Sequence, residues 1–107
     1  MSHMFIPDLA QEISIPEKGI LSTVLRKDDF VNITLFAFAN GEELTAHSAP
    51  TPATLYFLEG EAIVQLGSET VQARQGSFTY MPPMLPHSIA AKTATKMLLV
   101  QIKMQTK

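Results

Sequence analysis

Residues 54–66 read TLYFLEGEAIVQL, and this stretch decides the fold. β-Branched, aromatic and aliphatic residues fill residues 54–58 and 62–66, and Glu59-Gly60-Glu61 separates the two runs as a turn. Short apolar runs that end at a glycine are typical of β-strands, and no helical spacing of apolar residues competes with them here. The pattern predicts a hairpin centred on Gly60.

Further strands are predicted upstream of this stretch. Residues 30–39 read FVNITLFAFA, with apolar residues at positions 31, 33 and 35 on one face and polar residues between them. Both faces become apolar at Phe36 and Phe38, which we expect to pack in the core. Asn40-Gly41 ends this strand, because both residues tolerate the positive φ of a tight turn.

Downstream, residues 70–74 and 77–81 are predicted as short strands on either side of Gln75-Gly76. The proline-rich residues 82–86 form an extended loop, and residues 96–104 alternate as a half-buried final strand. No helix is required. About nine short strands with regular turns predict an all-β sandwich or small barrel.

Composition restricts both the size of the protein and its partners. A chain of 107 residues that is 46% hydrophobic is one domain, and without cysteine it has no thiolate chemistry. A formal net charge of −2 predicts no nucleic-acid partner, and the short apolar runs predict no membrane partner. No secretory signal is recognisable, so we expect a cytoplasmic protein.

The chain divides into an N-terminal arm, residues 1–19, and a barrel domain, residues 20–107. Residues 1–3 look like a cloning remnant ahead of a native start at Met4. The arm carries Ile6, Leu9, Ile13 and Ile15, which is too apolar a set for a free tail. We expect it to pack on its own barrel or across a partner, and the second alternative predicts a homodimer.

Few side chains could carry chemistry. Most of the carboxylates, including Asp28-Asp29 and Glu42-Glu43, flank turns, where we interpret them as solvated charges. The sequence contains neither a GxSxG nucleophile elbow nor a glycine-rich phosphate loop. His47 and His87 therefore remain as the candidate functional residues.

These two histidines stand in blocks with a distinctive spacing. Gly41 is followed after five residues by His47-Ser48-Ala49-Pro50, and Gly76 is followed after five residues by Pro82, with His87 beyond it. The blocks resemble the two motifs of the cupin superfamily, G-x5-H-x-H-x3-4-E-x6-G and G-x5-P-x-G-x2-H-x3-N. The resemblance spans roughly residues 30–104. It implies a double-stranded β-helix, the jelly-roll barrel of RmlC-like cupins.

The resemblance also implies a metal site with three His and one Glu, of which this chain keeps half. His47 matches the first histidine and His87 matches the histidine of the second motif. The remaining motif positions are substituted: Ala49 for the second histidine, Pro52 or Ala53 for the glutamate, Met84 for the glycine and Ala91 for the asparagine. A divalent transition metal (Zn, Ni, Fe, Mn or Cu) would be weakly held by two histidines, because catalytic metals usually take three protein ligands.

Two functions follow from the resemblance. The first is a small-molecule-binding cupin, with an apolar or carboxylated ligand held between His47 and His87 and no metal required. Strand alternation from the histidines turns Thr45, Ala49, Ile89 and Ala91 inward as an apolar floor. The other ligand-binding candidates are Tyr56, Tyr80, Met81 and Met84.

The second function is a metal-dependent enzyme, an isomerase, decarboxylase or dioxygenase, in which water or substrate completes a two-histidine metal site. A third reading, a sensing or dimerisation domain, would need a separate DNA-binding partner. Alternatively, the histidines are polar residues of a mostly apolar barrel, hydrogen-bonded to each other, to water or to a ligand. The residues themselves leave catalysis open.

Overall fold

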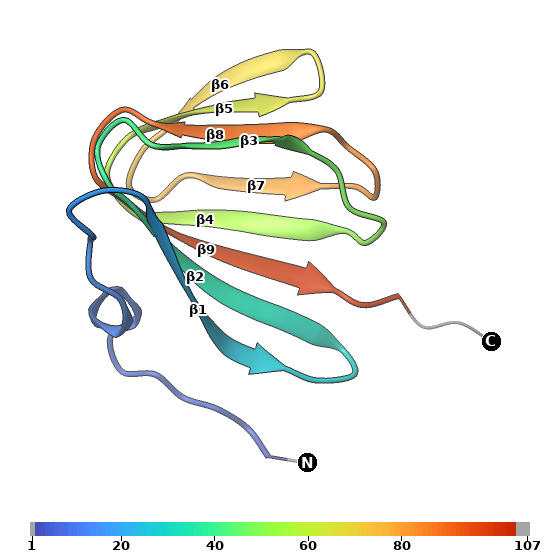
Figure 1. The fold of residues 1–107 in the computed structure, drawn as a ribbon. Coiled ribbons are helices and arrows are strands. Elements are labelled where there is room, and N and C mark those ends of the chain that lie inside the picture. The colour runs from blue at the N-terminus through green and yellow to red at the C-terminus, as the bar shows by residue number, and fades with distance from the viewer. Residues whose placement is uncertain (1, 105–107) are drawn as a thin grey trace.

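A computed structural model describes residues 2–104, in which an arm of residues 2–19 precedes nine strands joined by turns and loops (Figure 1). Met1 and residues 105–107, which the sequence analysis assigned to the arm and the barrel domain, lie outside the described residues. The elements are a 3-10 helix η1 (Leu9–Glu12) and the strands β1 (Ile20–Lys27), β2 (Val31–Phe38), β3 (Glu43–His47), β4 (Ala53–Glu59), β5 (Ala62–Leu66), β6 (Glu69–Ala73), β7 (Phe78–Met81), β8 (His87–Ala91) and β9 (Thr95–Ile102).

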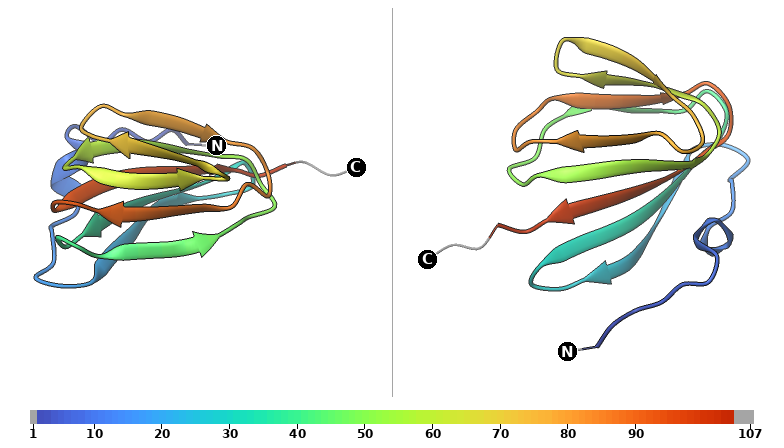
Figure 2. Two further views of the ribbon diagram at one scale, coloured as in Figure 1. Left: turned by 90° about the horizontal axis from the view of Figure 1, so that it is seen from above. Right: turned by 180° about the vertical axis from the view of Figure 1, so that it is seen from behind.

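The strands form two antiparallel sheets, as the all-β jelly-roll prediction required (Figure 2). The five-stranded sheet has the order β1-β2-β9-β4-β7, and the four-stranded sheet has the order β3-β8-β5-β6. The predicted strands of residues 30–39, 70–74, 77–81 and 96–104 are confirmed to within two residues at each end. Among residues 2–104, no helix is long and apolar enough to cross a membrane.

The predicted hairpin around Gly60 is wrong, because its two runs belong to different sheets. Strand β4 pairs with β7 and β9 in the five-stranded sheet, whereas β5 pairs with β6 and β8 in the other. Gly60 is the corner between them, with φ +87°, and a Cβ built there would lie 2.1 Å from the Ala94 carbonyl oxygen. Glycine is thus required where the chain leaves one sheet for the other.

Two apolar clusters stabilise the fold. The first fills the space between the sheets and includes Phe38, Phe57, Val64 and Ile89, all almost fully buried. Phe36 packs against this cluster beside Phe38, so the predicted core role of both rings is confirmed. Burial of each such side chain stabilises the fold by roughly 1.5–3 kcal/mol.

The second cluster lies on the outer face of the five-stranded sheet, beneath the arm. Ile13 of the arm is buried against Leu35 and Ala37 of β2, and Leu9 and Ile15 pack beside it. The Nζ of Lys96 donates a hydrogen bond of 2.6 Å to the Ala10 carbonyl and lies 3.6 Å from the Glu59 carboxylate. Of the two packing modes expected for the arm, the structure shows the one on its own barrel.

This second cluster shows which way the faces of β2 and β9 point. Positions 33 and 35 of β2 and position 98 of β9 point to the outer face, with Leu35 and Leu98 in the arm cluster. The alternate positions, Asn32 and Thr34 on β2 and Leu99 and Gln101 on β9, face the space between the sheets. The interior therefore receives polar side chains at the end of the barrel where β2 begins and β9 ends.

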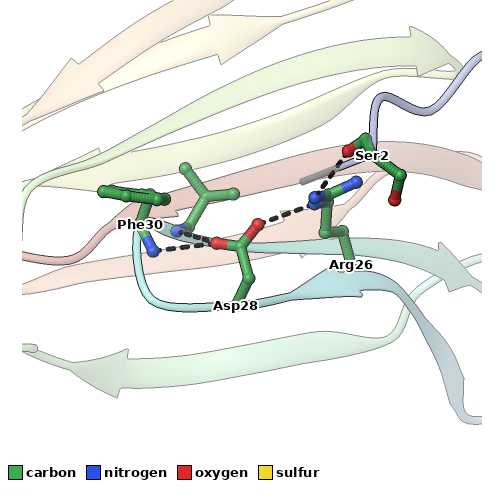
Figure 3. Close-up of polar contacts among 5 residues, drawn as sticks. Ser2, Arg26, Asp28 and Phe30 are labelled. Carbon is green, nitrogen blue, oxygen red and sulfur yellow. Dashed lines mark hydrogen bonds and ion pairs between the residues drawn. The ribbon is translucent and has the colours of Figure 1, made fainter.

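Asp28 fixes the turn between β1 and β2, a structural role beyond the solvated one expected (Figure 3). One carboxylate oxygen accepts hydrogen bonds from the backbone amides of Phe30 and Val31, and the other accepts one of 2.7 Å from Arg26 Nε. The hydrogen bond from Arg26, helped by the two amides, lowers the pKa of Asp28 to about 2. Arg26 also donates to the Ser2 carbonyl, which ties the start of the arm to β1.

Asp28→Asn should reduce stability at neutral pH, because the amide keeps its shape but loses the charge that Arg26 and the two amides solvate. The folded pKa of about 2 lies below the ordinary 3.8, so the carboxylate stabilises the fold above about pH 4. This stabilisation is lost as the pH falls toward 2. Urea unfolding of both proteins at pH 7, 4 and 2 should show a difference in the free energy of unfolding that is largest at pH 7 and smallest at pH 2, and a constant difference would contradict the assignment.

Gly60→Ala should destabilise the protein by about 3 kcal/mol or more, because the added Cβ meets the backbone of Ala94 and Thr95. Gly76→Ala is the matched control: its φ is +93°, but nothing lies within 4 Å of the added atom. The Gly76→Ala control should lose about 1 kcal/mol of stability, from the unfavourable backbone conformation alone. Urea unfolding midpoints measure both, and equal losses would show that Gly60 is only a turn residue.

Candidate functional site

A small cavity opens between the two sheets at the end where β3 and β7 finish and β8 begins. Its volume is about 80 Å³, enough for a group of a few heavy atoms. Its walls come from β3, β4, β7, β8, β9 and the two proline-containing loops. The lining residues are His47, Ala49, Thr51, Ala53, Met81, Pro82, Leu85, His87, Leu99 and Gln101.

The structure brings His47 and His87 together directly. The two residues pair across β3 and β8, and their ring centroids lie 4.3 Å apart at an interplanar angle of 57°. His87 is 8% exposed, on a strand between β3 and β5, whereas His47 lies on the edge strand β3 and is exposed. One ring is thus set into the wall of the cavity and the other lies at its mouth.

A β-bulge in β3 decides which residues accompany His47. Leu44 pairs with Ile89 and His47 pairs with His87, so β3 spans three residues where β8 spans two. The bulge shifts the alternation by one position, so Leu44 packs against the core and Thr45 is exposed. The prediction that Thr45 turns inward is therefore wrong, whereas Ile89 and Ala91 are buried as expected.

Both histidines are oriented by the same local hydrogen bond. His47 Nδ1 lies 3.0 Å from the Thr45 carbonyl oxygen, and His87 Nδ1 lies 2.9 Å from the Leu85 carbonyl oxygen. A carbonyl oxygen only accepts, so each Nδ1 carries a proton, and in the neutral form of each ring the lone pair lies on Nε2. The pair therefore presents two acceptor nitrogens, which suit a hydrogen-bond donor or a metal ion.

Of the other predicted site residues, some line the cavity and some lie outside it. Met81, which is buried, and Ala49 line the cavity beside the histidines. Tyr56 and Tyr80 lie on the outer face of the five-stranded sheet, because Leu55 and Met81 take the inward positions of β4 and β7. Met84 projects into solvent at 59% exposure. These three side chains do not line the cavity.

Gln101 is the functional candidate that sequence reasoning missed. It lines the cavity from β9 and pairs in register with Ala53, one of the two positions where the cupin motif has its glutamate. On its other side it pairs with Asn32, whose buried Oδ1 has no hydrogen-bond partner within residues 2–104. The available signal was the alternation of β9 itself, which places a polar residue on the same face as Leu99.

Within the described part of the chain, no third His, Cys, Asp or Glu joins the histidines to form a metal-ligating group. The polar groups that line the cavity are the two imidazole rings, the Gln101 amide and the Thr51 hydroxyl. This set is well suited to hydrogen bonding. It could hold a transition metal only with oxygen ligands from Gln101, water or a bound molecule.

The model of the family described as "Cupin domain" matches residues 34–102 of the chain. Among solved structures, a conserved protein of unknown function from Streptococcus pyogenes is 33% identical, with a TM-score of 0.88, covering 99% of this chain and 93% of that one. A cupin superfamily protein from Desulfitobacterium hafniense is 28% identical, with a TM-score of 0.86 and coverage of 97% and 94%. None of the curated proteins compared with the chain matches it.

Met84 occupies a backbone conformation that suits glycine, the residue of the cupin motif at this position. Its φ is +70°, and Met84 is the one non-glycine residue with positive φ within residues 2–104. Its amide donates a 2.7 Å hydrogen bond to the Ala49 carbonyl, which joins the two motif loops at the cavity mouth. The hydrogen bond holds the loop in place despite the steric cost of the side chain.

Met84→Gly should therefore stabilise the protein by up to about 1 kcal/mol. The substitution removes about 1–2 kcal/mol of backbone strain from the folded state. This gain is partly offset by about 0.5–1 kcal/mol, because glycine has more conformational freedom in the unfolded chain. Met84→Ala is the matched control, because it removes the exposed side chain but keeps the strained Cβ. Urea unfolding of the three proteins should rank the glycine variant highest, and an alanine variant of equal or greater stability would contradict the assignment.

Proposed function

This chain belongs to the cupin family, and from that premise we propose that it is a small-molecule-binding cupin whose ligand hydrogen-bonds to His47 and His87. The observation that supports the proposal is the pair of Nδ1 hydrogen bonds to backbone carbonyls. They hold both rings in one tautomer, with Nε2 as an acceptor on each. The site is therefore preorganised, and the ligand need not order these side chains on binding.

The chemistry of the cavity selects the kind of group that binds. Two acceptor nitrogens favour a hydroxyl, phenol or N–H donor, whereas an ionised carboxylate offers only further acceptors. The amide of Gln101 supplies both a donor and an acceptor on the opposite sheet. At about 80 Å³ the cavity takes a small polar head, while the rest of a larger ligand would extend past Pro82 and His47 at the mouth.

A metal-dependent function is the second candidate, favoured by the same free Nε2 positions. His47 and His87 would hold the ion, and Gln101, which pairs with Ala53, would offer an amide oxygen near the position of the missing glutamate. A bound transition metal would supply Lewis acidity to an oxygen-bearing ligand. The chain's own contribution is to orient the two imidazoles and to surround them with apolar side chains such as Leu99 and Met81.

Thermal unfolding with added probes separates the two candidates. EDTA-treated protein should be melted with catechol, with acetate, and with Zn²⁺, Ni²⁺ or Mn²⁺ alone. A ligand at ten times its Kd adds about 1.4 kcal/mol and should raise Tm by roughly 5–10 °C. The small-molecule proposal expects this shift with catechol in the absence of metal, and a smaller one with acetate.

Variants identify the site responsible. His87→Leu and Gln101→Leu should abolish or reduce the shift, and His3→Ala is the matched control because His3 lies on the arm, away from the cavity. A shift that requires metal and disappears in His87→Leu would favour the second candidate. Elemental analysis of untagged protein purified without added metal then gives the occupancy. No shift with any probe, or shifts that persist in His87→Leu, would reject both.

A further inference from the structure

Asn32 carries the one buried side-chain oxygen or nitrogen within residues 2–104 that has no hydrogen-bond partner. This atom, Oδ1, belongs to a side chain on the face of β2 that points into the space between the sheets. A buried acceptor without a donor is unfavourable, and nearly all such atoms in folded proteins are paired. The packing of the fold therefore does not account for an asparagine at this position.

Strand register places Asn32 at one end of a row of residues that forms one wall of the cavity. Asn32 pairs with Gln101 of β9, and Gln101 pairs with Ala53 of β4. Ala53 pairs in turn with Met81 of β7, and residues paired in this way have their side chains on the same face of the sheet. Gln101, Ala53 and Met81 all line the cavity. Figure 1 shows β2 beside β9, so Asn32 lies next to Gln101 and just outside the cavity lining.

Two side chains beside Asn32 carry donors that could satisfy its Oδ1. Lys27 pairs with Asn32 from β1, but Lys27 is exposed, and its ammonium group would lose hydration by turning to a buried oxygen. Gln101 is neutral and partly buried, and its Nε2 carries two N–H donors. The last torsion of a glutamine side chain is soft, so the carboxamide turns at little cost. Gln101 is therefore the donor that suits Asn32.

We propose that Asn32 is a positioning residue that orients the Gln101 carboxamide, with Nε2 donating to Asn32 Oδ1 and Oε1 turned toward the cavity. The consequence for the ligand rests on the proposed function, in which His47 and His87 bind it through their acceptor nitrogens. With Gln101 held in this way, the cavity presents hydrogen-bond acceptors on both of its walls. A ligand must then donate a hydrogen bond to each wall.

This requirement defines the class of ligand as a neutral compound with hydroxyl groups on adjacent carbons, a 1,2-diol or a catechol. Two such hydroxyls donate in two directions and form a head small enough for a cavity of about 80 Å³. An ether, a carbonyl or an ionised carboxylate offers only acceptors to walls that already accept. An ammonium group would donate to both walls, but no carboxylate lines the cavity to balance its charge.

Titration calorimetry of EDTA-treated protein with catechol and with guaiacol tests the proposal. Guaiacol has the same ring, but a methyl ether replaces one hydroxyl donor, so it should bind the wild type at least about tenfold more weakly than catechol. In Asn32→Leu the carboxamide loses its acceptor and is free to turn Nε2 toward the ether. The ratio of the two Kd values should then fall to about threefold or less. Asn32→Asp keeps an acceptor oxygen and should keep the wild-type ratio.

Thr34→Val is the matched control, because Thr34 is the next inward residue of β2 and pairs with Leu99 instead of Gln101. It should also keep the wild-type ratio. Asn32→Ala replaces the leucine variant if that variant does not fold. A preference for catechol that survives in a folded Asn32→Leu or Asn32→Ala, or that is lost in Thr34→Val as well, would overturn the positioning role.

A second readout needs no ligand. In NMR spectra of isotope-labelled protein, one Nε2 proton of Gln101 should exchange slowly with solvent in the wild type and in Asn32→Asp, and quickly in Asn32→Leu. Equal exchange in the wild type and Asn32→Leu would overturn the positioning role. If neither probe binds the wild type, the proposed function fails and the ligand class fails with it, whereas a protected Gln101 proton would still support the contact with Asn32.

Discussion

The fold depends on a backbone constraint at Gly60. The chain must leave the five-stranded sheet after β4 and enter the four-stranded sheet at β5, and it turns against the Ala94 carbonyl with no room for a side chain. If residues 54–66 instead closed as a simple hairpin, β4 and β5 would share one sheet. The two layers, the core between them and the cavity at their far end all follow from this change of sheet.

The site depends in turn on the pairing of β3 with β8. The bulge after Leu44 restores the register at His47, so the histidines of two distant motifs lie side by side. Backbone carbonyls two residues earlier in the chain, at Thr45 and Leu85, then orient both rings. This chain differs from the full cupin motif in the cavity wall opposite the histidines. That wall carries Ala53 and Gln101, and no carboxylate lines it. Recognition by hydrogen bonds is the chemistry such a wall supports.

Local patterns predicted the strands, and the resemblance to the cupin motifs brought the two histidines together, but neither predicted the arrangement of faces. Alternation in residues 31–35 correctly indicated a strand, yet its apolar side chains lie on the outer face, where the arm covers Leu35, so polarity alone could not tell that Asn32 rather than Ile33 faces the interior. The bulge in β3 escaped prediction because an inserted residue leaves no mark in a five-residue strand. Gln101 was missed for a related reason: its neighbours on β9 suggested burial of the opposite face. The glycine of residues 59–61 was interpreted as a turn because its steric partner, Ala94, lies far along the chain.

The position of β9 has a consequence for biosynthesis. Among the strands of residues 2–104, β9 comes last in the sequence, yet it lies at the centre of the five-stranded sheet, between β2 and β4. The lysine that anchors the arm also belongs to β9, and its partner, the Ala10 carbonyl, is 86 residues earlier. During translation the edge of β2 that pairs with β9 must therefore stay unpaired until β9 has left the ribosome. Folding is consequently a late event dominated by distant contacts, the kind of topology that folds slowly and exposes nascent strands to aggregation.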